Sequence, residues 1–313
     1  MRLSALDCLR RGWTNLSANW ELVFMQWLQA FVVLSLMALG AFLFLLILGV
    51  NLVGGAGEAE EAMRRLANLP PALLLGLTAM LSLWLLSLFL HCYFQAGTYG
   101  VLTAAERQAL PGPRRDRTFF RTFSLRDFLG WSGLYVWRFF GLLALFWAVA
   151  FGIALVALAW MAFTGVAGVR WGAPAAFGAG LGGALPMAFL VLVLALWVNL
   201  AQAGLAREGS GVRLASRQGL SVLGRRLGAI AGLFLLGLIV AVGVALAFVP
   251  LSLAADALLA DVPRTRALVR FLLFLMQSLP NTLLAMVLAG ALVALVRSET
   301  PGEGRRKPEV LTA

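Results

Sequence analysis

Six long runs without a single charged side chain leave this sequence few possible folds. Each run holds between 26 and 40 residues. A helix needs only about 20 apolar residues to cross the roughly 30 Å hydrocarbon layer of a membrane. Every run can therefore span a membrane once, and none contains the polar loop that a second crossing would need. The runs comprise residues 22–57, 66–105, 139–169, 171–206, 227–255 and 271–296.

The composition supports the same class of protein. Of the 313 residues, 12% are charged and 61% are hydrophobic, whereas about a quarter of the residues of a soluble domain are charged. In lipid, an unpaired backbone amide costs several kcal/mol, so spanning segments must be helices or the strands of closed barrels. The runs lack the alternation of barrel strands. We predict an all-α polytopic membrane protein with six transmembrane helices.

Polarity divides the sequence into three parts. Residues 1–21 are predicted to form an interfacial lead-in helix, with Ser4 and Asp7 placed as in a helix N-cap. Residues 22–297 form the predicted six-helix transmembrane domain, and residues 298–313 a disordered tail. Because of Pro186, the fourth span is expected to begin either near Ala176 or near Met187. With the later start, the predicted spans are about 22–53, 72–99, 139–163, 187–206, 227–255 and 267–296.

The basic residues alternate between the loops. With six spans, 19 of the 25 Lys and Arg residues fall on one side and six on the other. The stretch from His91 to Trp131 alone carries six arginines between the second and third spans. Since basic loops stay in the cytoplasm, we expect a multi-pass protein with both termini in the cytoplasm.

Short similarities along the chain indicate an internal repeat. Ser4 and Asp7 match Ser124 and Asp127, and the segment 12–16 matches 219–223. Such repetition is typical of tandem structural units. We predict three tandem helical hairpins, each entered through an amphipathic interfacial helix. Similar triplets end the second, fourth and sixth spans: Gln95-Ala96-Gly97, Gln202-Ala203-Gly204 and Leu288-Ala289-Gly290.

These features resemble a known family. The interfacial W-x-x-L lead-ins, the polar-to-Ala-Gly span ends, the FFRTF sequence at 119–123 and the S-R-x-G sequence at 216–219 are similar to the six-helix membrane domains that accompany some bacterial glycerophosphodiester phosphodiesterases. The resemblance implies a location in the bacterial inner membrane. In that family the chemistry belongs to a separate barrel domain, which this sequence lacks, so no phosphodiesterase activity is implied.

The titratable and nucleophilic residues form no catalytic or metal-binding pattern. His91 is the only histidine, and Cys8 and Cys92 lack the spacing of metal ligands. A structural role for His91 between helices is a simpler interpretation than a proton relay. We predict no catalytic residue, no metal site and no cofactor, and we do not expect an enzyme. The net charge of +11 is explained by the basic loops, so no nucleic-acid partner is expected.

Uncharged polar residues inside the spans are the first candidates for a site. They either join helices through hydrogen bonds, each contributing about 0.6–2 kcal/mol, or converge in a cavity for a lipid headgroup or a small polar ligand. Pro280 favours the cavity because a proline within a span bends the helix. The candidate cavity residues are His91, Gln95, Asn199, Gln202, Gln277 and Asn281.

The arginine-rich loops are the second candidates. Their simplest role is to set the membrane orientation. Alternatively, they bind anionic lipids, since each basic residue near an anionic surface contributes about 1 kcal/mol. The candidate lipid contacts are Arg114, Arg115, Arg117, Arg121, Arg126, Arg213, Arg217, Arg225 and Arg226.

From these features we expect a non-enzymatic membrane protein that organises a partner protein or a lipid. Its expected partners are membrane lipids, anionic lipids among them, and another membrane protein or a second copy of the chain. A lipid or small-molecule transporter is the alternative. A polar path or a lateral opening between hairpins would favour transport, and a solid core would favour partner binding.

Overall fold

The computed structural model describes residues 3–52, 59–109, 117–206 and 211–299. Within these residues the chain forms α-helices and one short 3₁₀ helix, η1, without any strand. The predicted all-α class is confirmed. The elements are α1 (Ala5–Ala18), α2 (Glu21–Leu52), α3 (Ala59–Gln108), η1 (Arg117–Phe120), α4 (Leu125–Trp171), α5 (Ala173–Leu205), α6 (Val212–Leu258) and α7 (Pro263–Ser298).

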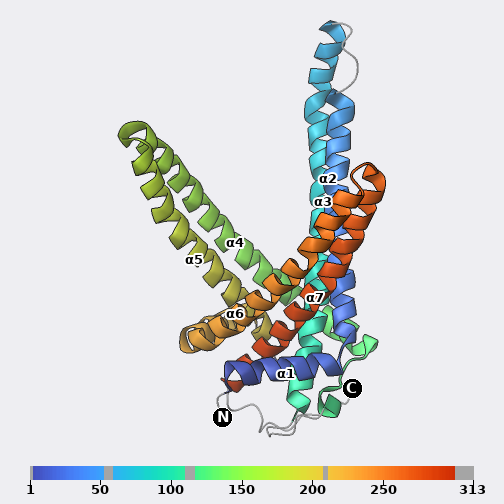
Figure 1. Cartoon of the computed structure of the whole chain (residues 1–313), viewed down its shortest axis with the longest axis vertical. Coiled ribbons are helices and arrows are strands. Elements are labelled where there is room, and N and C mark those ends of the chain that lie inside the picture. The colour runs from blue at the N-terminus through green and yellow to red at the C-terminus, as the bar shows by residue number, and fades with distance from the viewer. Residues whose placement is uncertain (1–2, 53–58, 110–116, 207–210, 300–313) are drawn as a thin grey trace.

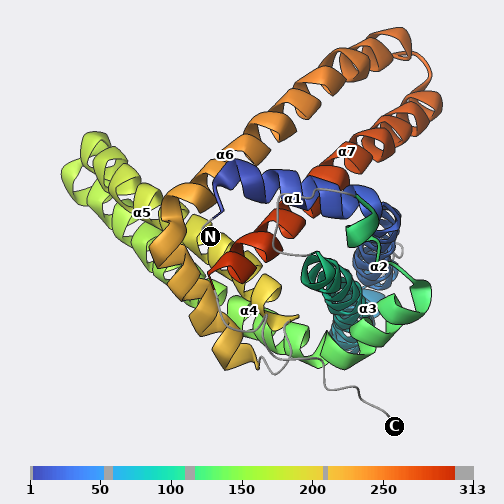
Figure 2. The same ribbon diagram turned by 90° about the horizontal axis from the view of Figure 1, so that it is seen from below.

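Helices α2 to α7 are each long and apolar enough to cross a membrane, as the six charge-free runs predict. Consecutive helices pair into the hairpins α2/α3, α4/α5 and α6/α7 (Figure 1). The three hairpins meet at one end, here called the junction, where α1 and the first turns of α4 and α6 also lie. From the junction the hairpins diverge toward separate tips (Figures 1 and 2). The prediction of three tandem hairpins is confirmed.

The helices extend beyond the predicted spans. The predicted start of the second span at about residue 72 lies inside α3, as do Pro70 and Pro71 just before it, and Pro186 lies inside α5. Helix α5 begins at Ala173, close to the earlier of the two predicted starts, with a proline in its first turn. A proline is tolerated in the first turn because its missing N–H has no intrahelical partner there. The predicted disordered tail lies outside the described residues from residue 300 onward.

The lead-in segments join their hairpins in three ways. Helix α1 ends at Ala18, and the backbone of its C-cap residue Asn19 leaves the helical region before α2 begins. The second lead-in begins at Leu125 and forms the first part of α4, which continues into the spanning part without a break. The third continues into α6 across a kink at Arg226, where φ is −130° and ψ is 25°. The predicted N-caps are confirmed, because the Ser4 and Ser124 hydroxyls accept hydrogen bonds from backbone N–H groups three residues on, at 3.1 and 3.0 Å.

The three lead-ins bury matching faces. In each, the buried residues follow the helical spacing i, i+4, i+7 and i+8, which places them on one side of the helix. The matching sets agree with the repeat predicted from the sequence. They are Cys8, Gly12, Asn15 and Leu16 in α1, Phe128, Ser132, Tyr135 and Val136 in α4, and Ala215, Gly219, Val222 and Leu223 in α6.

Each buried face crosses a hairpin helix at a residue without a bulky side chain. A Cβ atom at Gly290 of α7 would lie 3.0 Å from the Cα of Gly12 in α1. A Cβ at Gly97 of α3 would lie 2.8 Å from the Phe128 ring of α4, and one at Gly219 of α6 would lie 3.1 Å from the backbone nitrogen of Ala201 in α5. Small residues allow this close backbone approach.

These crossings close a ring at the junction. The start of α4 lies against the first hairpin, the start of α6 against the second, and α1 against the third. Since α1 leads into the first hairpin and crosses the last helix of the third, the two ends of the membrane domain are held together (Figure 2).

A methyl group at Gly12 is expected to disrupt this ring. A Cβ there would lie 2.6 Å from the backbone nitrogen of Ala291, so α1 and α7 would have to separate. We expect Gly12→Ala to lower the free energy of unfolding by about 1–3 kcal/mol, measured by tryptophan fluorescence during unfolding in detergent. Gly130 is the control, because nothing lies within 4 Å of a Cβ there. Gly130→Ala should be neutral or stabilising, and equal effects of the two substitutions would contradict the crossing.

Candidate functional site

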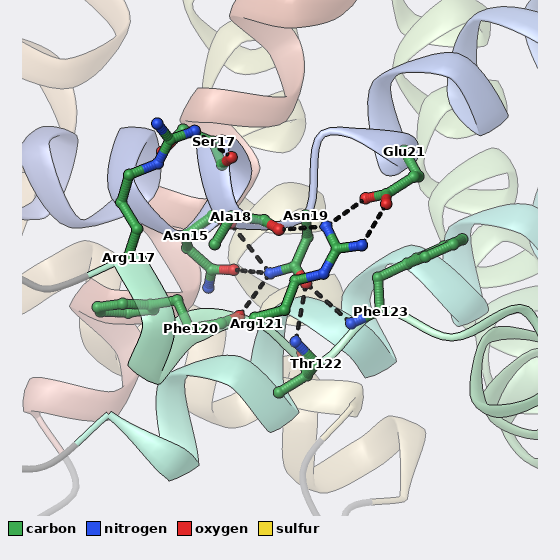
Figure 3. A network of polar contacts seen from close by, with 10 residues as sticks. All are labelled: Asn15, Ser17, Ala18, Asn19, Glu21, Arg117, Phe120, Arg121, Thr122 and Phe123. Atoms are coloured by element: carbon green, nitrogen blue, oxygen red, sulfur yellow. Dashed lines mark hydrogen bonds and ion pairs between the residues drawn. The ribbon is translucent and has the colours of Figure 1, made fainter.

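The junction contains a buried polar network around Asn19 (Figure 3). The Asn19 side-chain amide donates to the backbone carbonyl of Phe120 at 2.7 Å. Its oxygen accepts from the backbone N–H groups of Thr122 and Phe123, both at 2.9 Å. Asn15 donates to the carbonyl of Leu102 at 3.0 Å. Asn19 thus supplies the partners that the irregular backbone at residues 120–123 needs, because buried N–H and C=O groups must be paired.

Two of the predicted lipid-contact arginines belong to this network. Arg121 contacts both carboxylate oxygens of Glu21, at 2.9 and 2.5 Å, and donates to the carbonyl of Ala18 at 2.6 Å. Arg117 donates to the carbonyl of Ser17 at 2.5 Å. These contacts fix residues 117–123 against the break between α1 and α2 (Figure 3). The FFRTF sequence therefore supports the junction.

The remaining candidate arginines separate into three groups. Arg226, at the kink of α6, pairs with Glu299 at 2.5 Å, and both side chains are largely buried. Arg114 and Arg115 lie outside the described residues. The other four have exposed side chains and no ion pair with any described acidic residue. They are Arg126, Arg213, Arg217 and Arg225.

A buried carboxylate joins three elements at the junction. The Glu106 side chain on α3 is 1% exposed and lies 3.1 Å from Arg11 of α1 and 3.8 Å from Arg297 of α7. Breaking a buried ion pair by removing one partner typically costs about 3–5 kcal/mol. Glu106 directly follows the charge-free run 66–105, where a charge is expected to be solvated, so the sequence alone does not indicate that this carboxylate is buried.

Cys8 lies beside this cluster. Burial raises the pKa of its thiol to about 11, and the nearby Glu106 acts in the same direction. The thiol therefore stays protonated at neutral pH, whereas the thiolate is the nucleophile and the metal ligand. Within the described ranges, no three His, Cys, Asp or Glu residues are grouped so as to hold a metal ion.

Two of the predicted cavity residues join α3 to α2. His91 Nδ1 is 2.9 Å from Gln29 Nε2, and Gln95 Nε2 donates to Gln26 Oε1 at 3.3 Å. Gln26 in turn donates to Thr98 at 2.6 Å. The sequence-based prediction did not include Gln26 and Gln29. Their spacing of three residues places both on one face of α2, which is the signal that could have identified them. The polar residues of this hairpin serve as interhelical hydrogen-bonding partners.

The next two candidates lie on α5. The Asn199 side chain donates to the carbonyl of Ala195 in its own helix at 2.7 Å. Gln202 is half-buried near the junction end of the same helix. Neither residue lines the groove described next.

The last two candidates, Gln277 and Asn281, line a groove along α7. The groove has a volume of about 430 Å³. Its residues lie three or four positions apart, so they form one stripe along the helix. Trp27 of α2 borders the stripe, because its indole N–H donates to the Ser278 hydroxyl at 2.8 Å. The lining residues are Phe274, Gln277, Ser278, Asn281, Thr282 and Ala285.

The hydroxyl groups of the stripe are satisfied within α7, whereas its two carboxamides are not. Ser278 donates to the carbonyl of Leu275 at 2.7 Å, and Thr282 donates to that of Ser278 at 2.9 Å. Among the described residues, neither Gln277 nor Asn281 has a hydrogen-bond partner for its side chain. Asn281 is exposed and Gln277 half-buried.

The two carboxamides lie at membrane depth. Asn281 is about 17 Å along the helix from Arg270 and about 24 Å from Arg297, at roughly 1.5 Å per residue. It therefore lies well inside the charge-free part of α7, which is the part that crosses the hydrocarbon layer. Exposing an unpaired amide to hydrocarbon costs roughly 4–8 kcal/mol. A polar partner for this stripe would remove that cost.

Comparisons with known protein families, with curated proteins and with solved structures find no match to this chain. The resemblance to the membrane domains of glycerophosphodiester phosphodiesterases stays a prediction.

Replacing Asn19 tests the junction network. Asn19→Ala would leave the N–H groups of Thr122 and Phe123 and the carbonyl of Phe120 without their partner. We expect the free energy of unfolding in mixed micelles to fall by roughly 2–5 kcal/mol, since each buried unsatisfied group costs about 1–3 kcal/mol.

Asn199→Ala is the matched control, because that side chain bonds only to its own helix. It should change the free energy of unfolding by less than about 1 kcal/mol. A similar loss in both variants would show that asparagine removal destabilises the chain generally and would contradict a special role for Asn19.

Proposed function

We propose that this multi-pass membrane protein is a non-enzymatic scaffold that binds a transmembrane helix of a partner protein along α7. The observation that carries the proposal is the pair of carboxamides, Gln277 and Asn281, that have no hydrogen-bond partner among the described residues and lie at membrane depth. A second polypeptide helix can bring hydroxyl, amide or carbonyl groups to that depth, where interhelical hydrogen bonds contribute about 0.6–2 kcal/mol each.

The shape of the stripe favours a helix as the occupant. The lining residues follow helical spacing over three turns, as the contact line between two packed helices does. Ser278, Thr282 and Ala285 are small, which allows close approach of a second backbone. A phospholipid headgroup is the less suitable occupant, because headgroups lie at the membrane surface and the carboxamides lie within the hydrocarbon region.

The chemistry of the groove favours binding over catalysis. Its polar lining consists of two carboxamides and two hydroxyls, and the hydroxyls donate to backbone carbonyls of α7. Neither kind of group serves as a general base near neutral pH. They do offer both donors and acceptors, which is what recognition of a polar helix requires.

The proposed orientation places the junction in the cytoplasm of a bacterial cell, at the inner membrane, with both chain termini on that side. The support is the charge distribution: 19 of the 25 Lys and Arg residues belong to the segments on the junction side. In this orientation the ring of crossings lies at the cytoplasmic surface, and the α7 groove faces the surrounding lipid.

Site-specific photo-crosslinking tests the proposal. A benzoylphenylalanine placed at Phe274 lies in the stripe, whereas one at Leu279 lies on another face of α7 and is similarly exposed. In native membranes we expect the probe at position 274 to form an adduct with a transmembrane segment of another polypeptide. The same probe at position 279 should not form that adduct. An adduct with a second copy of the chain would show that the partner helix is α7, or a helix next to it, in that second copy.

The carboxamides supply the second arm of the test. In the Gln277→Leu/Asn281→Leu background, the adduct at position 274 should be lost. The two leucines keep the apolar bulk of the side chains but cannot form the proposed hydrogen bonds to the partner helix. A protein adduct that persists in this background, or that forms equally at position 279, would contradict the proposal. Phospholipid adducts alone at position 274 would instead favour the lipid-transport alternative.

A further inference from the structure

The first segment of α6, residues 212–225 before the kink at Arg226, presents a basic surface that no described acidic side chain neutralises. Arg213, Arg217 and Arg225 are exposed, and no described acidic residue forms an ion pair with them. They contrast with Arg117, Arg121 and Arg226, whose guanidinium groups bind carbonyls or carboxylates of the chain. Within the described part of the chain, these three arginines are therefore open to an external anion.

Large apolar side chains lie among these arginines. Leu214 is 48% exposed and Leu220 is 54% exposed. The opposite side of the segment is buried: Gly219 contacts the backbone of α5, and Ala215 lies against Gly204. Because the packed side is fixed, the arginines and leucines together face away from the protein. A surface that mixes cations with exposed leucines suits a lipid interface better than water, since leucine side chains gain nothing from contact with water.

The kink sets the level of this segment in the membrane. At Arg226 the backbone leaves helical geometry, and the apolar part of α6 begins directly after it. Arg226 also pairs with Glu299 just beyond the end of α7, which holds the kink at the end of the third hairpin. Figures 1 and 2 show the first segment of α6 at the junction end, beside the ends of the spanning helices. Its arginines consequently lie near the depth of lipid phosphates.

We propose that residues 212–225 of α6 bind the phosphate groups of anionic phospholipids, with Arg213, Arg217 and Arg225 as the cationic contacts and Leu214 and Leu220 inserted among the acyl chains. Guanidinium groups pair with phosphate oxygens through two parallel hydrogen bonds. A soluble anion would use the arginines alone, whereas a membrane surface also explains the exposed leucines. This lipid contact is independent of the partner helix proposed for α7.

The test uses the purified full-length chain in neutral detergent, with phosphatidylglycerol added and bound lipid counted by native mass spectrometry. Arg213→Gln/Arg217→Gln should weaken phosphatidylglycerol binding by about fivefold for each arginine removed. Phosphatidylcholine binding should change little. The control is Arg170→Gln/Arg264→Gln, which removes the same charge from exposed arginines at the hairpin tips. That variant should bind phosphatidylglycerol as the wild-type chain does.

Two further measurements separate a lipid from a soluble anion. Leu214→Ser/Leu220→Ser, which keeps every charge, should also weaken phosphatidylglycerol binding. Inorganic phosphate at the same concentration should not compete with the lipid. Unchanged lipid binding in the arginine variant, an equal loss in the tip control, or full competition by phosphate would overturn the proposal. Melting temperatures close to that of the wild-type chain would establish that each variant is folded.

Discussion

The architecture depends on the close approach of helix backbones at the junction. In lipid, exposed apolar side chains give no driving force for helices to associate, so packing and hydrogen bonds must hold them together. The crossings provide packing at Gly12 on Gly290, at Phe128 on Gly97 and at Gly219 on Ala201. Each crossing ties one lead-in to one hairpin, and α1 closes the ring. Without α1, the third hairpin would keep its contacts with α5 and its few contacts with α2 and α3, but it would lose the crossing that closes the ring.

Buried polar groups also hold the junction together, whereas the hairpins separate away from it. Asn19 satisfies an irregular backbone, and Glu106 holds α1, α3 and α7 together through two arginines. Away from the junction the hairpins diverge, and α7 keeps a polar stripe uncovered at Gln277 and Asn281. A rigid base with separated arms is suited to holding another membrane helix, because the arms present surfaces without needing to rearrange one another.

The sequence predicted the spanning helices well because crossing a membrane depends on composition, and each charge-free run corresponds to one of α2 to α7. The span-end glycines were recognised as a repeat, but their role in crossing lead-in helices requires knowledge of which segments meet. Asn19 and Glu106 were missed for a related reason. Each lies in a segment that contains many polar residues, so one more polar side chain does not stand out as buried. In addition, Asn19 contacts Phe120, which is 101 residues away in the sequence. Of the six predicted cavity residues, only Gln277 and Asn281 line the groove. His91 and Gln95 instead meet glutamines on α2, and predicting that contact requires knowing which faces of α2 and α3 pack together.

The central claim is that three hairpins are joined at one end and separate at the other. Spin labels at Val169 and Leu258, the highly exposed tips of the second and third hairpins, measure that separation directly by pulsed electron resonance. The chain would carry Cys8→Ala and Cys92→Ala and be placed in lipid nanodiscs. The structure predicts a separation far beyond the roughly 8–10 Å between the axes of packed helices. A short, narrow distance distribution, as expected for tips packed in a closed six-helix bundle, would contradict the account.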